Sequence, residues 1–90
     1  MTLFDMQEVP WNPDEARLNV TTDWQLEQAI HRFEQDGATD QLHAIAWYYD
    51  HTKHNVDQAQ LWYQRNVDAH GPYWRVSQYN LGKVRGHAAP

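Results

Sequence analysis

The segment from Asp50 to Asp57 holds the side chains best suited to metal chemistry. Its candidate ligands are Asp50, His51, His54 and Asp57, with the two histidines three residues apart. Carboxylate and imidazole groups bind zinc and other divalent metals. The histidines also stand at the end of a predicted helix, where an imidazolium is favourable beside the last carbonyl groups without any metal. We therefore expect no cofactor and keep a metal-dependent role through His51 and His54 as the third functional hypothesis.

Acyl transfer would require a nucleophile beside an oriented base. The only serine, Ser77, lacks the glycines of a nucleophile elbow, and the nearest histidine in sequence, His70, lies across a helix break. Gly82-Lys83 lacks the other residues of a phosphate-binding loop. The sequence therefore predicts a protein that is not an enzyme.

The net charge of −5 is unevenly distributed over the 90 residues. Residues 1–40 hold nine acidic residues against Arg17 and Arg32, whereas residues 41–90 hold three against five Lys or Arg. Nucleic-acid binding needs clustered cations that neutralise phosphates, so this distribution argues against a nucleic-acid partner. It is typical of a protein that binds a protein partner with a basic surface.

The sequence contains no cysteine, which excludes disulfides and thiolate metal sites. Its first residues carry acids and Pro10 where a secretory signal would carry cations and an apolar run. No stretch approaches the roughly 18 apolar residues of a membrane span. We expect a cytoplasmic protein without membrane contact.

Apolar residues at steps of three and four predict helices after residue 21. A first helix is expected over about 23–36, capped by Thr22 and stopped by Gly37. A second is expected from a cap at Thr39 through about Thr52.

The same spacing predicts two further helices. The third begins at Asn55 and ends where Gly71 adopts a left-handed conformation, and Pro72 occupies the first turn of the fourth. We expect a flexible acidic arm over 1–21, a helical domain over 22–86 and a disordered tail over 87–90.

Parts of the helical region repeat one another, which is a signature of stacked helical units. Residues 41–46 align with residues 77–82 at an offset of 36, and each segment ends on a small residue, Ala46 or Gly82. Such a residue lets one helix approach its neighbour closely.

The repeated pattern resembles the Sel-like repeat, a relative of the tetratricopeptide repeat. The matching residues are Ala59, Trp62, Tyr63, Gly71, Ser77, Leu81 and Gly82, and more faintly Ala29, Phe33, Gly37, Ile45, Ala46 and Tyr49. The resemblance spans about residues 23–84. It implies an all-α fold of four helices in two stacked antiparallel hairpins, a short solenoid. It also implies a scaffold or adaptor that binds protein in a helix-lined groove.

One side of the second helix is the predicted groove. That side presents His43, Trp47 and Asp50, and the offset of 36 sets Tyr79 against His43 and Lys83 against Trp47. Aromatic, histidine and charged groups on one face are typical of a binding hot spot. The alternative for Trp47 is packing beneath the arm or a loop.

Three functions follow from these observations. The favoured one is a non-catalytic protein-interaction module. The second is a small acidic inhibitor, of phage or antitoxin type, that covers a basic surface with the acids of residues 1–40. The metal-dependent role is third. Two hairpins are fewer than a solenoid usually needs, so a homodimer stays open as a way to cover an exposed end.

Overall fold

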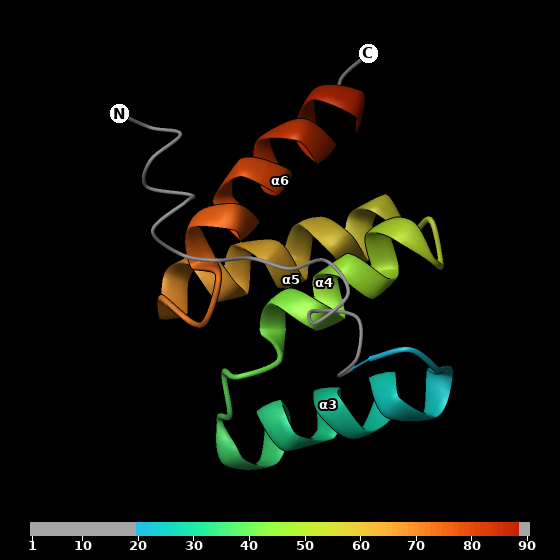
Figure 1. Cartoon of the computed structure of the whole chain (residues 1–90), viewed down its shortest axis with the longest axis vertical. Coiled ribbons are helices and arrows are strands. Elements are labelled where there is room, and N and C mark those ends of the chain that lie inside the picture. The colour runs from blue at the N-terminus through green and yellow to red at the C-terminus, as the bar shows by residue number, and fades with distance from the viewer. Residues whose placement is uncertain (1–19, 89–90) are drawn as a thin grey trace.

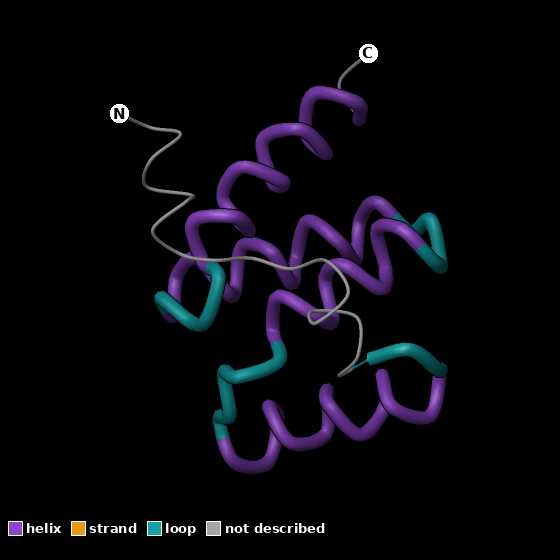
Figure 2. The backbone as a smooth tube through the Cα atoms, in the orientation of Figure 1, coloured by secondary structure: helices purple, strands orange, loops and turns teal. Residues whose placement is uncertain are grey.

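A computed structural model describes residues 20–88 of the chain. These residues form four helices and no strand: α3 (Asp23–Asp36), α4 (Leu42–His51), α5 (Val56–Ala69) and α6 (Trp74–Ala88). Figures 1 and 2 show them in the same orientation. The predicted all-α class is confirmed for this part of the chain. Residues 1–19 of the predicted arm and residues 89–90 of the predicted tail lie outside the described residues.

Three of the predicted helix ends are confirmed by their hydrogen bonds. The side chain of Thr22 accepts a hydrogen bond from the N–H of Gln25 at the start of α3. Gly37 ends α3 with a left-handed φ of 69°. The side chain of Asn55 caps α5 by accepting from the N–H of Gln58. These bonds join residues close in sequence, so the local pattern determines them.

The start of α4 and the end of α5 differ from the prediction. Gln41 rather than Thr39 precedes α4, and it makes no side-chain capping bond. His70, with φ 51°, takes the left-handed position after α5 that was expected of Gly71. Gly71 is needed for close packing instead, because a Cβ there would overlap Asn66 Oδ1 and lie 2.9 Å from the Thr39 carbonyl oxygen.

The turn before α6 also differs from the prediction. Tyr73 has a φ of 63° and lies between Pro72 and the first residue of the helix, Trp74. Pro72 therefore lies in the turn and not in the first turn of α6.

Each helix packs against the next one in sequence, and α5 forms close contacts with both α4 and α6. In Figure 1, α3 and α6 lie on opposite sides of the α4 and α5 pair. Two contacts attach α3 at both ends: the Tyr48 hydroxyl donates to Asp23 Oδ1 at 2.7 Å, and Arg32 Nη1 lies 3.3 Å from Asp40 Oδ2.

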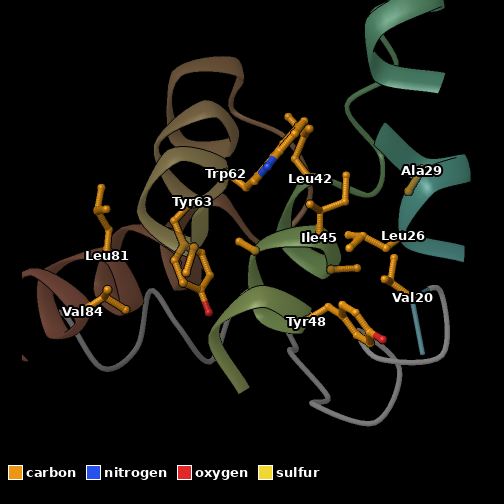
Figure 3. Close-up of a cluster of buried hydrophobic side chains, with 13 residues drawn as sticks. Val20, Leu26, Ala29, Leu42, Ile45, Tyr48, Trp62, Tyr63, Leu81 and Val84 are labelled. Atoms are coloured by element: carbon orange, nitrogen blue, oxygen red, sulfur yellow. The ribbon is translucent and has the colours of Figure 1, made fainter. Parts of the chain in front are cut away.

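The core is formed where α4 meets its neighbours. Its buried residues are Val20, Leu26, Ala29, Leu42, Ala44, Ile45, Ala46, Tyr48, Ala59, Trp62, Tyr63, Leu81 and Val84. Figure 3 shows Val20, Leu26 and Ile45 pointing toward one another. On α5, Ala59, Trp62 and Tyr63 are buried, whereas Val56 in its first turn is 38% exposed.

Candidate functional site

The structure divides the predicted groove residues between the core and the surface. His43 is only 3% exposed, whereas Tyr79 is 55% exposed and Lys83 is also exposed. Trp47 and Asp50 are half-buried. The expectation that His43 lines an open groove is therefore corrected: its ring is packed inside the protein.

His43 belongs to a buried hydrogen-bond network that joins α4, α5 and α6. Its Nδ1 lies 2.6 Å from the Ser77 hydroxyl oxygen. Asn66 Nδ2 donates to the same oxygen at 2.8 Å and to the Pro72 carbonyl oxygen at 3.0 Å. The rings of Tyr63 and Tyr73 lie against the imidazole, with centroids 5.7 and 5.8 Å away.

The chemistry of these groups determines how the Asn66 amide is oriented. A carbonyl oxygen only accepts, so the amide nitrogen of Asn66 must face Pro72, and it also donates to Ser77 Oγ. Ser77 Oγ has one hydrogen and two lone pairs, so it can donate to an unprotonated His43 Nδ1 or accept from a protonated one, depending on the tautomer of the ring. Burial, followed by the nearby charge of His51, lowers the pKa of His43 from 6.5 to about 4.

A serine hydroxyl that is hydrogen-bonded to an imidazole nitrogen is the arrangement found in activated nucleophiles. Here Ser77 is 0% exposed and His43 is 3% exposed, so a substrate has no access to the hydroxyl. We interpret the pair as a structural contact that attaches α6 to α4. Sequence reasoning missed it because the two residues are 34 positions apart and no motif connects them.

A second network connects the same helices nearer the surface. The Tyr63 hydroxyl donates to Asp50 Oδ2 at 3.0 Å and accepts from Asn80 Nδ2 at 3.4 Å. Burial and the negative charge of Asp50 raise the pKa of Tyr63, so the hydroxyl keeps its proton and remains a donor. One hydroxyl thus bridges Asp50 on α4 and Asn80 on α6.

Both helices that the Tyr63 hydroxyl connects carry aromatic side chains close to this bridge in sequence. On α4, the rings of Trp47 and His51 are in contact, with centroids 3.6 Å apart and planes tilted by 41°. His51 Nε2 also lies 3.4 Å from Asp50 Oδ2. On α6, the Lys83 ammonium nitrogen lies 5.6 Å from the centroid of the exposed Tyr79 ring. This geometry is that of a weak cation–π contact.

The two histidines of the metal hypothesis lie apart from any ligand cluster. Both are exposed, and His54 adopts a φ of 53° in the connection between α4 and α5. Among the side chains that the structure describes, no three from His, Cys, Asp or Glu come together in a way that could hold a metal ion.

Two general findings complete the description of the site. None of the described helices has the length and apolar character needed to cross a membrane. No family model matches the chain, and no match was found among curated proteins or among solved structures. The likeness to Sel-like repeats therefore stays a prediction from the sequence.

Proposed function

We propose that this protein is a non-catalytic module that binds another protein through the surface formed by α4 and α6. The α4–α6 surface comprises Trp47, Asp50, His51, Tyr79 and Lys83. The observation that carries the proposal is Tyr79, a large ring that is 55% exposed with an ammonium group above it. Tyrosine is among the residue types enriched at the centres of protein interfaces.

The surface is held in place by the hydrogen bonds beneath it. Tyr63 bridges Asp50 and Asn80, so the positions that carry Trp47 and Tyr79 are fixed relative to one another. A preorganised surface loses little conformational entropy when a partner binds. This supports binding without a large rearrangement of α4 or α6.

A finer architecture is part of the same proposal: two antiparallel helical hairpins stacked as in a Sel-like solenoid. The contacts at both ends of α3 support it. Asp23 in the first turn of α3 meets Tyr48 near the end of α4, and Arg32 in the C-terminal half of α3 reaches Asp40 just before α4. Both contacts support an antiparallel arrangement of α3 and α4, as in the first hairpin of such a pair.

The experiment compares three immobilised variants with the wild type in affinity capture from the native host, followed by binding measurements with the identified partner. Tyr79→Ala and Lys83→Glu should each weaken partner binding about tenfold or more, because both change the centre of the surface. Leu61→Gln is the control, since Leu61 is an exposed side chain on α5. A partner bound equally by all variants would contradict the proposal.

The acidic inhibitor is a second candidate, and the exposure of the acids on α3 favours it. The exposed acidic residues of α3 include Glu27, Glu34 and Asp36. Arg32 is the only Arg or Lys in the sequence of that helix. Under this function, replacing Glu27 and Glu34 by lysine should abolish binding of a basic partner, while Tyr79→Ala should leave it unchanged. Raising the salt concentration should also weaken binding steeply.

A further inference from the structure

Nothing in the described part of the chain requires a glycine at position 82, because a side chain there would have room. Gly82 lies in the middle of α6, where glycine is less favourable than alanine. A Cβ at Gly82 would meet no described atom within 4 Å, in contrast to the overlap found at Gly71. The residue is also exposed. Its lack of a side chain therefore leaves a shallow gap on the outer side of α6.

The neighbours of this gap suit the approach of another helix. Tyr79 lies one turn before Gly82, Lys83 lies one turn after Tyr79, and both are exposed. Within its residue range, α6 contains Arg75, Lys83 and Arg85 and no acidic residue. The outer face of α6, defined by Tyr79, Gly82 and Lys83, is thus a cationic surface with one aromatic ring and a gap beside it.

The outer side of α3 has the opposite charge. Trp24 is 68% exposed, and Glu27, His31 and Glu34 follow at steps of three and four residues, which places them on one side of the helix. All four are exposed. The outer face of α3, defined by these four residues, therefore offers an aromatic ring and two carboxylates.

We propose that the outer face of α3 in a second copy of this chain packs against the outer face of α6. Charge complementarity between Glu27 or Glu34 and Lys83 selects this pairing, and the gap at Gly82 lets the two helices approach closely. In Figure 1 the helices α3 and α6 lie on opposite sides of the α4 and α5 pair, so the contact joins separate copies. The inference rests on the proposed function, because it names a partner for Tyr79 and Lys83.

The contact is head to tail, since different faces meet. Each added copy leaves one α3 face and one α6 face open, so association continues beyond a dimer unless a ring closes. The purified full chain should therefore show an average mass in sedimentation equilibrium that rises with concentration. Raising the salt from about 50 mM to about 500 mM should lower that mass because the charges are exposed.

Gly82→Leu tests the gap directly. Because nothing described lies within 4 Å of the added Cβ, and leucine favours a helix, the monomer should keep its helical circular dichroism and thermal midpoint. The dissociation constant for self-association should rise about tenfold or more. Leu61→Gln, at an exposed position of α5, is the control and should associate like the wild type.

A mixing experiment tests the pairing of unlike faces. One variant carries Gly82→Leu on α6, and the other carries Trp24→Ala, Glu27→Lys and Glu34→Lys on α3. Each variant alone should self-associate about tenfold or more weakly than the wild type. Mixed together, they retain one intact face of each kind and should form a one-to-one dimer that grows no further. No dimer in the mixture, with a self-associating wild type, would overturn the head-to-tail contact.

Failure of this inference is distinguishable from failure of the proposed function. A wild-type chain that stays monomeric at every concentration, with Gly82→Leu unchanged, would overturn the self-association. The proposed function would still stand if Tyr79→Ala lost a captured host protein, and the occupant of the α6 face would then be that protein. If Tyr79→Ala also had no effect on capture, both would be wrong.

Discussion

Acid should destabilise this protein through His43, and the size of the effect follows from the structure. The unfolded chain takes up the His43 proton near pH 6.5, whereas the buried ring in the folded chain takes it up only near pH 4. The folded pKa is lowered, so the unfolded state binds more protons between these values and stability falls as the pH falls. Each pKa unit is worth about 1.4 kcal/mol, which gives a total loss of roughly 3 kcal/mol.

Most of this loss occurs before the carboxylates titrate. Between pH 7.5 and pH 5, the difference in proton binding by His43 corresponds to about 2 kcal/mol of unfolding free energy. A small domain has a stability of only several kcal/mol, so the change is a large fraction of the total. Urea titrations followed by circular dichroism at both pH values measure it directly.

His43→Gln separates this effect from the other titrating groups. Its side chain is neutral at both pH values and offers an oxygen that can accept from Ser77, so the variant should be less stable at pH 7.5 but should lose little more at pH 5. The reasoning is refuted if the wild type changes by less than about 0.5 kcal/mol over this range. An equal pH slope in the wild type and the variant would also refute it.

Four further substitutions test the contacts around the networks by chemical denaturation. Gly71→Ala should destabilise the protein by about 1–3 kcal/mol because its methyl group overlaps Asn66. Gly82→Ala should stabilise the monomer by about 0.5–1 kcal/mol because its methyl group meets no described atom. Equal effects at the two glycines would contradict this. Ser77→Ala should cost about 1–3 kcal/mol by leaving the His43 and Asn66 nitrogen atoms without their shared partner, and an unchanged stability would argue against the network. Tyr63→Phe removes the hydroxyl between α4 and α6 and should cost about 1 kcal/mol; no loss would mean that water replaces the bridge.

Part of the candidate site could be predicted from the sequence. Tyr79 and Lys83 are exposed on α6 as the helical spacing required, and they lie close together because they are four residues apart. The prediction that His43 lines an open groove was wrong for a physical reason. Six of the ten residues of α4 are buried, because several elements pack around this helix, so its periodicity could not tell an open side from a covered one.

The sequence by itself determined the helices and three of their ends. Thr22, Gly37 and Asn55 act through bonds to residues three or four positions away, and such bonds depend only on the local chain. The tertiary structure alone decided that Ser77 would meet His43 and that Gly71 would lie against Thr39. These contacts join residues more than 30 positions apart, and their geometry depends on how the helices cross, which no local pattern encodes.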